Sequence, residues 1–384
     1  MITAQGLESG ERPLVTFALF AYNQAQFVRE AVEGALSQEY SPLEVILSDD
    51  CSTDGTFEIM ADVARAYRGP HRVLLNRNDP NLGLVPHINK VLCELASSDL
   101  LVVAAGDDVS IPTRTGRLHR AWAESGGKAL MVSSAMELID GDGAHLGLRA
   151  PTRKGIAIDR SFAMILDPTG SLYGAAALYH RDVFRIFGPL SVAQVEDGPL
   201  AIRSQLLGPT VAIPDVLVRK RIAGSNLGEA SGGDHRAHAR RGHRYRISIY
   251  DQAMLDIRSA DFARLRLVDD PEPLLQQCGI HRRKHEAYLD LIQSGGLIPR
   301  LRAWAELARV VTWRQSLDNL LYLLPGFAYP YARRAWIPAK RALGRPLTWI
   351  GRMLGGRRTQ DSATVHDRSP ANASARDPSR SPND

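Results

Sequence analysis

Acidic side chains stand next to each other at three places in the sequence. Asp49 and Asp50 lie in SDDCSTDGT (48–56), a second pair lies in AAGDDVSIP (104–112), and Glu-Asp lies in QVEDGPLAIR (194–203). Neighbouring carboxylates repel each other unless a cation or a ligand uses them. A hard divalent cation prefers carboxylate and phosphate oxygens, and an exposed carboxylate can act as a general base. The three segments therefore suggest two kinds of chemistry. One is the binding of a diphosphate together with Mg²⁺ or Mn²⁺, and the other is removal of a proton by a carboxylate.

Simpler interpretations exist for each segment. Ser52 or Asp54 can cap the next helix, Gly55 can make the turn, and the other two pairs can be a solvated turn and a helix cap. A calcium loop starting at Asp50 is excluded because its twelfth position, which needs Glu, is Ala61. A DxDGT phosphatase motif is excluded because Ser52 stands in place of the nucleophilic aspartate.

The elements around these segments alternate between strands and helices. The apolar runs predict strands at 14–22, 43–48, 73–75, 100–105 and 129–138, and the helical spacing predicts helices at 27–36, 56–67 and 87–96. This alternation is typical of a parallel sheet with helices on both faces. Ligands bind such sheets at the carboxyl ends of the strands. We therefore expect Asn23, residues 48–54 and residues 106–108 to meet in one crevice.

Composition excludes several classes of protein. The chain has 384 residues, of which 44% are hydrophobic and 23% charged, so it is no disordered, collagen-like or polytopic membrane protein. Its three cysteines form no CxxC pair, which excludes a disulfide scaffold and a cysteine zinc site. Neither an apolar leader at residues 1–13 nor an apolar run of 18 residues is present. We expect a cytoplasmic protein.

Basic residues gather toward the C-terminal part. Residues 300–358 hold twelve Lys and Arg against two acids, and four of the five tryptophans. Such a segment suits an anionic membrane surface, which would place the protein on the inner face of the membrane. The alternative is an ordinary helical subdomain with a solvated basic face, and we expect no nucleic-acid partner. The predicted organisation is a sheet domain at 13–227, a helical basic region at 228–358 with breaks at 269–273 and 295–299, and a disordered tail at 359–384.

A histidine-rich stretch lies near the predicted domain boundary. Asp234, His235, His238 and His243 stand among four arginines. Histidines three residues apart can share a metal on one helix face. We favour a solvated basic segment instead.

The ordered set of motifs resembles a family-2-type glycosyltransferase of the GT-A fold. The segments that carry the resemblance are FAYNQAQFVREAVEGALSQEYSPLEVILSDDCSTDGT (20–56), NLGL (81–84) with Asn89, AGDD (105–108), VEDG (195–198) and RIAGSN (221–226). Together they extend from about Val15 to Asn226. The resemblance implies an α/β domain of the Rossmann-like α/β/α type that binds nucleotide-diphosphate sugars, and an inverting transfer.

The resemblance also implies roles for individual residues. Those that would border the nucleotide sugar are Ala21, Asn23, Asp50, Ser52, Asn89, Asp107 and Arg221. Asp50 would face the base, most often uracil, and Asp107 would lie near the ribose and the sugar. Asp108 would hold Mg²⁺ or Mn²⁺. Asp197 would be the catalytic base with Glu196 in support, and Arg219 or Arg221 would approach the diphosphate.

One position departs from the family pattern R-x-H-x-x-N, because Ala223 replaces the histidine that commonly contacts metal or phosphate. We expect transfer from a UDP- or dTDP-sugar to a saccharide or lipid-linked hydroxyl, in cell-surface polysaccharide assembly. A dinucleotide-dependent oxidoreductase is disfavoured because AYNQAQF (21–27) lacks the required glycines. A non-catalytic nucleotide-binding or scaffold protein stays open as the alternative.

Overall fold

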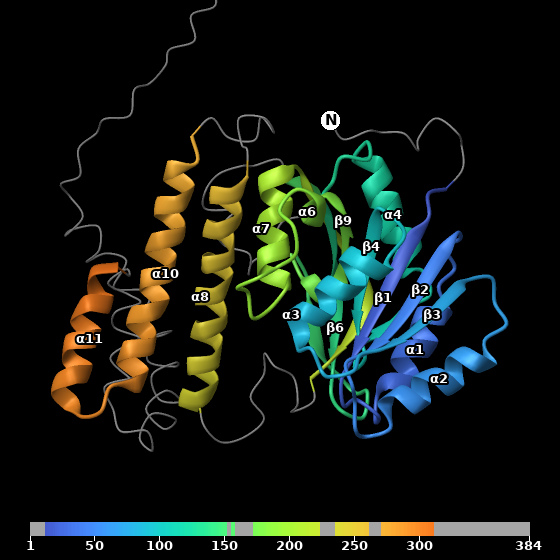
Figure 1. Ribbon diagram of the computed structural model, residues 1–384, viewed down its shortest axis with the longest axis horizontal. Helices are drawn as coiled ribbons and strands as arrows, with labels where there is room; N and C mark the ends of the chain where they lie inside the picture. Colours follow the sequence, from blue (N-terminus) through green and yellow to red (C-terminus); the bar gives the residue numbers. More distant parts are fainter. Residues whose placement is uncertain (1–11, 152–154, 158–171, 223–234, 261–269, 311–384) are drawn as a thin grey trace, which may run out of the picture. The chain divides into compact units, whose positions relative to one another are not determined.

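A computed structural model describes residues 12–151, 155–157, 172–222, 235–260 and 270–310 (Figure 1). All of these residues belong to the first of two compact units, Met1–Gly326. The predicted disordered tail and residues 311–358 of the predicted basic region lie outside the described residues. The division at residue 227 therefore stays a prediction.

A ten-stranded mixed sheet forms the centre of the described chain. Its strands are β1 (Val15–Ala21), β2 (Leu43–Asp49), β3 (Arg72–Arg77), β4 (Leu100–Ala105), β5 (Val109–Ser110), β6 (Met131–Ile139), β7 (His145–Arg149), β8 (Gly155–Ala157), β9 (Ala177–His180) and β10 (Thr210–Arg221). The order is β3-β2-β1-β4-β9-β6-β10-β5, with β7 beside β6 and β8 beside β10. All five predicted strands are present.

The sheet is parallel only in part. Strands β1, β2, β3 and β4 pair in parallel, as predicted, and so do β6 and β10. The expectation of a wholly parallel sheet is wrong, because β9 pairs antiparallel with both β4 and β6. Strand β9 was not predicted because it has only four residues. Strand β10 was not predicted because Pro214 and Asp215 interrupt its apolar pattern. Proline cannot donate to a strand ladder, and the register of β10 shifts between Ile213 and Val216.

Helices cover both faces of the sheet. They are α1 (Val28–Leu36), α2 (Thr56–Ala66), α3 (Leu84–Asn89) continued by the π-helix η1 (Lys90–Leu95), α4 (Arg114–Glu124), the short 3₁₀-helix η2 (Gly174–Ala176), α6 (Asp182–Arg185) and α7 (Asp197–Leu207). Alternate residues of β1 face opposite sides: Phe17 joins the core under α1, α2 and α4, and Ala18 joins the core under α3 and α7. This confirms the predicted α/β/α layers.

Three long helices form the described C-terminal region, as predicted: α8 (His235–Ser259), α10 (Glu272–Gln293) and α11 (Leu297–Val310). In Figure 1 they follow one another beside α7, and each packs on its neighbour. Helix α8 contributes Ile249, Tyr250, Ala253 and Ile257 to the core under α7. The helical region is therefore continuous with the sheet domain through the α7–α8 contact.

Candidate active site

The loops after β1 and β2 are joined by hydrogen bonds at the carboxyl end of the sheet. The Asn23 amide donates to Ser52 Oγ at 2.9 Å, and the Thr53 amide donates to Asn23 Oδ1 at 3.0 Å. Asn23 and Cys51 both adopt left-handed backbone angles, with φ of 50° and 62°. Such strain in a non-glycine residue costs about 1–3 kcal/mol and is common at functional sites. The predicted meeting of these two loops is confirmed.

Asp50 is buried and holds the neighbouring loop. Its carboxylate accepts hydrogen bonds from Asn78 Nδ2 at 2.8 Å and from the amides of Leu82 and Gly83, each at 2.9 Å. The side-chain amide of Asn81 also donates to the Asp50 carbonyl at 2.6 Å. Asp50 thus orders residues 78–83 at the site, and its contact with a base stays a prediction.

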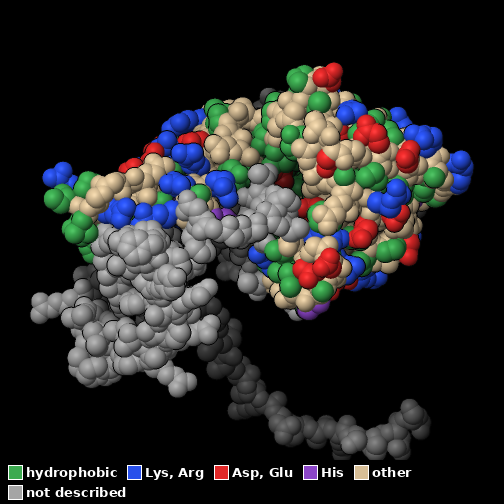
Figure 2. Space-filling view, turned by 90° about the horizontal axis from the view of Figure 1, so that it is seen from below, with side chains coloured by type: hydrophobic (Ala, Val, Ile, Leu, Met, Phe, Trp, Pro, Cys, Tyr) green, Lys and Arg blue, Asp and Glu red, His purple; other side chains and the backbone are tan. Residues whose placement is uncertain are grey.

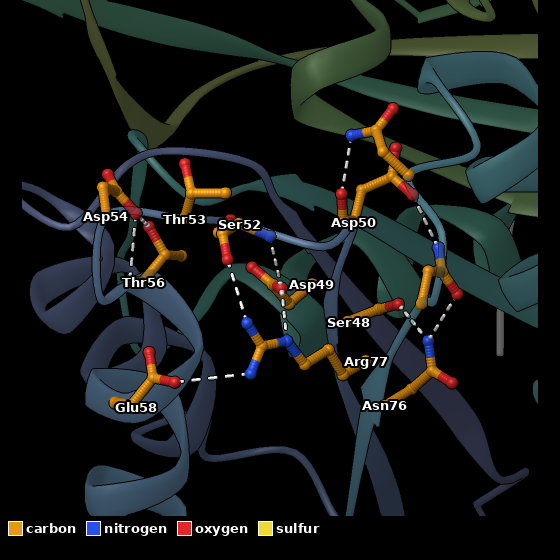
Figure 3. Close-up of polar contacts among 12 residues, drawn as sticks. Ser48, Asp49, Asp50, Ser52, Thr53, Asp54, Thr56, Glu58, Asn76 and Arg77 are labelled. Carbon is orange, nitrogen blue, oxygen red and sulfur yellow. Dashed lines mark hydrogen bonds and ion pairs between the residues drawn. The ribbon is translucent and has the colours of Figure 1, made fainter.

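Asp49 is a site residue to which the sequence assigned no role of its own. Its side chain is fully buried, and Oδ2 accepts the Ser52 amide at 2.9 Å with Arg77 Nε 3.7 Å away (Figure 3). In the described part of the chain, Oδ1 has no hydrogen-bond partner. A buried acceptor without a partner is expensive, so this oxygen would gain from any donor that reaches it.

Arg77 closes this side of the site. Its guanidinium donates to the Ser52 carbonyl at 2.9 Å, lies 3.3 Å from Glu58 Oε1, and stands over the Phe57 ring at 4.8 Å (Figure 3). The side chain is 39% exposed, so part of it faces solvent. The loop after β2 therefore holds a buried carboxylate oxygen of Asp49 that has no hydrogen-bond partner among the described residues, beside the partly exposed guanidinium of Arg77.

Asp107 and Asp108 follow β4, and both are buried. Asp108 Oδ1 accepts the Arg221 amide at 2.9 Å, and Oδ2 lies 3.5 Å from Lys220 Nζ. Burial and, second, the charge of Asp108 raise the pKa of Asp107 to about 6. The positive charges of Lys220 and Arg221 therefore do not fully offset the effects of burial and of Asp108 on the pKa of Asp107.

This donor set fits a divalent cation. Mg²⁺ and Mn²⁺ are commonly bound by one or two carboxylates together with phosphate oxygens of the substrate. Among the residues that the structure describes, no three His, Cys, Asp or Glu side chains lie close enough to form a metal site alone. Asp108, with Asp107 beside it, would hold the cation, and a bound diphosphate would supply the remaining ligands.

Lys220 and Arg221 end β10 in different environments. The Arg221 guanidinium is almost fully buried and bonds Glu30 Oε2 at 2.7 Å and the Gly141 carbonyl at 2.8 Å, over the Phe27 ring. Lys220 is 23% exposed beside Asp108. The contact of Arg221 with a diphosphate stays a prediction, and Lys220 is a cation at this site that the resemblance did not single out.

Glu196 and Asp197 lie at the start of α7. Asp197 is exposed, and its Oδ1 accepts the Gly198 amide at 2.7 Å. Burial and, second, the charge of Asp197 raise the pKa of Glu196 to about 7. The same pair stands close to the buried Tyr179 hydroxyl, whose pKa is raised by burial and then by these two acids. The helix start thus carries one exposed carboxylate and one that protonates easily.

A shared cation and a buried arginine connect the segments that carry the two acidic pairs. The charge of Lys220 opposes the rise in pKa at both Asp107 and Glu196, so it lies within electrostatic reach of both. The buried Arg114 guanidinium donates to the Val103 carbonyl in β4 at 2.7 Å and to the Ala175 carbonyl in η2 at 3.0 Å. Its contacts link the end of β4 to the segment against which Asp197 packs.

Two other predicted residues lie at this end of the sheet. Ala21 ends β1, and its carbonyl accepts the Asp50 amide at 3.0 Å. The Asn89 side chain accepts the Leu190 amide at 3.0 Å and donates to the Leu190 carbonyl at 2.7 Å. Asn89 thus holds the segment that leads to Glu196, and its contact with the nucleotide sugar stays a prediction.

Comparison with models of protein families identifies the domain that carries most of these residues. The model of glycosyl transferase family 2 matches residues 16–187, which include β1 to β4, β6, β9 and the Asp49–Asp50 and Asp107–Asp108 pairs. The chain carries a family-2 glycosyltransferase domain. The match ends before Glu196, Asp197 and Lys220, so it says nothing about the roles of these three residues.

Individual relatives are similar over part of the chain. EpsE of Bacillus subtilis is 37% identical over 102 residues, 27% of this chain and 36% of EpsE. The succinoglycan biosynthesis protein ExoO of Rhizobium meliloti is 34% identical over 134 residues, 35% of this chain and 36% of ExoO. The alignments thus span about a third of either relative. The glycosyltransferase domain accordingly has relatives in polysaccharide biosynthesis.

The fold has a solved counterpart. TarS 1–349 of S. aureus, determined in complex with UDP, superposes with a TM-score of 0.50 at 13% identity. The superposition covers 85% of this chain and 87% of that one. The similarity establishes the GT-A fold of the glycosyltransferase.

Proposed function

We propose that the glycosyltransferase moves a sugar from a UDP- or dTDP-sugar to a hydroxyl of a saccharide or lipid-linked acceptor, with inversion, in cell-surface polysaccharide assembly. The observation that carries the proposal is a cation, Lys220, that lies 3.5 Å from Asp108 of the first acidic pair, Asp107–Asp108. Its charge also opposes the rise in pKa of Glu196 in the second pair, Glu196–Asp197. One pair suits the donor diphosphate, and the other suits the acceptor hydroxyl. The polysaccharide setting is supported by the relation to ExoO.

Asp197 is the proposed general base. An acceptor hydroxyl is a poor nucleophile and must lose its proton as it attacks the anomeric carbon. Asp197 is exposed at the start of α7, where the positive end of the helix dipole favours its ionised form. Glu196, whose pKa is raised to about 7 by burial and by the charge of Asp197, is partly protonated near neutral pH, which lessens the negative charge beside the base. A single displacement with this base inverts the anomeric configuration.

The donor side binds the nucleotide diphosphate. Asp108, with Asp107 beside it, would hold Mg²⁺ or Mn²⁺, which when bound neutralises charge on the leaving diphosphate. Lys220 adds a positive charge beside Asp108 that can meet a phosphate oxygen. Asp50, which follows Asp49 at the end of β2, is the residue proposed to face the base of a uracil or thymine nucleotide.

Replacement of the base tests the catalytic proposal. We expect Asp197→Asn to lower transfer by about 10²–10⁴-fold and to leave nucleotide binding unchanged. The control is Asp62→Asn, which changes an exposed carboxylate on α2 and should alter neither quantity. An equal loss of transfer and of nucleotide binding in Asp197→Asn would refute the assignment of the base.

Calorimetry tests the donor. UDP, GDP and dTDP are titrated into the protein with and without Mn²⁺, and the titrations are repeated with Asp108→Ala. We expect UDP or dTDP to bind, with an affinity that Mn²⁺ raises in the wild type but not in the variant. Preferred binding of GDP would refute the pyrimidine nucleotide, and an equal response to Mn²⁺ in both proteins would refute the metal role of Asp108.

A peripheral contact with anionic membrane lipid is the last part of the proposal. In the described part of the chain, none of the helices is apolar over a length that could cross a bilayer. Helix α11 exposes Leu297, Ile298 and Leu301 by 62%, 67% and 43%, with Arg300 and Arg302 between and beside them. Figure 2 shows hydrophobic and basic side chains next to each other over the C-terminal helices. Such a helix face can enter the lipid interface.

Sedimentation with phosphatidylglycerol vesicles tests this contact. Joint replacement of Leu297, Ile298 and Leu301 by Ser should lower the bound fraction. The control replaces Leu146 and Leu148 of β7, which are exposed by 55% and 64%, with Ser. An equal loss in both variants, or no loss in either, would contradict a specific role of α11.

A further inference from the structure

The segment before the proposed base has no regular secondary structure, yet side chains hold its backbone. Residues 186–196 join α6 to α7 as an irregular stretch. Backbone amides outside helices and strands need other partners when they are shielded from water. The amides of residues 190, 191, 192 and 194 all donate to side chains from distant parts of the sequence.

Helix α8 supplies three of these four bonds. Gln252 Oε1 accepts the amide of Ser191 at 2.9 Å and the amide of Val192 at 3.0 Å. Ser248 Oγ, one turn earlier on the same face, accepts the amide of Gln194 at 3.0 Å. Gln252 is 1% exposed and Ser248 4% exposed, so solvent does not compete for these bonds.

Gln252 is itself oriented by its neighbours. Its Nε2 donates to Asp256 Oδ1 at 2.9 Å, and Asp256 pairs with Arg203 of α7. This bond assigns Oε1 as the oxygen that faces the two amides. On the same helix, Ile249 packs against Gly198, the residue after the proposed base, so closely that a Cβ there would lie 2.6 Å from its Cδ1. The segment is thus held on the α8 side up to Asp197.

We propose that Gln252 is a positioning residue for Asp197, acting through the segment 190–194. The inference rests on the proposed function, because it presumes that Asp197 is the base. It assigns a task in transfer to α8, which lies beyond the residues matched by the family model. Displacement of a catalytic group by about 1 Å can lower a rate by about 10²-fold, so loss of the two bonds should be visible in kcat.

The test compares two buried glutamines in the full-length protein. Gln252→Met keeps the side-chain length and removes the acceptor of two segment amides. Gln205→Met on α7 is the matched control, because Gln205 is also buried and, among the described residues, its side chain donates only to the Ala201 carbonyl of its own helix, at 3.3 Å. For each variant, kcat, the dissociation constant of the nucleotide diphosphate, and hydrogen exchange of a peptide covering 188–197 are measured.

We expect Gln252→Met to lower kcat by roughly 10- to 100-fold, to change the nucleotide dissociation constant less than twofold, and to speed exchange in the peptide. Gln205→Met should change none of the three. Faster exchange with unchanged kcat would overturn the proposal, and so would unchanged exchange. If wild-type transfer does not depend on Asp197, the proposed function fails first, and the exchange result still reports whether Gln252 holds the segment.

Discussion

Arg203 of α7 and Asp256 of α8 form a buried two-pronged ion pair between the sheet domain and the helical region. Nε and Nη2 each lie 2.8 Å from a carboxylate oxygen, and the side chains are 0% and 2% exposed. Loss of one partner leaves an uncompensated buried charge, which costs about 3–5 kcal/mol. We expect Asp256→Asn to lower the free energy of unfolding by that amount, measured by urea denaturation.

A surface pair between α8 and α10 provides the control. Arg282 Nε lies 2.6 Å from Asp251 Oδ1, but the side chains are 35% and 36% exposed. Exposed pairs contribute about 0–1 kcal/mol, so Asp251→Asn should change the unfolding free energy by no more than this. Equal effects of Asp251→Asn and Asp256→Asn would contradict the distinction between the buried and the exposed pair.

Gly174 of η2 leaves room for the proposed base. A Cβ at this position would lie 2.3 Å from Asp197 Cβ, so the start of α7 would have to move. We expect Gly174→Ala to destabilise the protein by about 1–3 kcal/mol and to lower kcat while the nucleotide still binds. The control is Gly116→Ala in α4, where nothing lies within 4 Å and an alanine should stabilise by about 0.5–1 kcal/mol. Full activity of Gly174→Ala would show that α7 tolerates the shift.

His243 of α8 and His285 of α10 are joined through their Nδ1 atoms at 2.9 Å. One ring must donate and the other accept, so the accepting ring is neutral. Burial, followed by nearby positive charges, lowers the pKa of His243 to about 4 and that of His285 to about 2. Below the unfolded pKa of about 6.5, the unfolded chain binds protons that the folded chain does not, so stability falls as pH falls from 7 toward 4.

Replacement of His285 by Phe tests this pH dependence. The variant keeps a ring against Tyr288 and His243 but removes one titrating group. Its unfolding free energy should decline less steeply between pH 6.5 and 5, by about 1.4 kcal/mol per pH unit. Urea denaturation at three pH values gives the slope. A slope equal to that of the wild type would show that His285 binds its proton in the folded state as well.

The parallel strands β1, β2 and β4 were predictable from the sequence because they are buried on both faces over nearly their whole length. Such burial gives a nearly continuous apolar run, as in Val15–Ala21, whereas the partly exposed β3 has only a short one at 73–75. Strand β9 could not be predicted because four residues are too few to show a periodic pattern, and β10 could not because Pro214 and Asp215 interrupt its pattern. Local pattern does not reveal which strands become neighbours across a long connection.

Site residues were predictable where the chemistry lies in adjacent positions. The pairs Asp107–Asp108 and Glu196–Asp197 stand out for that reason, although their roles stay predictions. Lys220 and Gln252 did not stand out, because their partners lie more than fifty residues away and only folding brings them together. His243 was expected on a solvated basic segment, and that expectation is wrong, because it pairs with a histidine of another helix.

Lys220 and Arg219 offer a direct test of which basic residue of β10 meets the diphosphate. Arg219 pairs with Glu137 at 3.1 Å and with the Gly143 carbonyl at 3.0 Å, whereas Lys220 lies beside Asp108. A hydrogen bond to a charged group is worth about 1.5–3 kcal/mol. We therefore expect Lys220→Met to weaken binding of UDP by roughly 10- to 100-fold and of UMP by much less, measured by calorimetry. Arg219→Met, the control, should change UDP binding less than threefold. The reverse order would make Arg219 the diphosphate ligand and leave Lys220 as the counter-charge of Asp108.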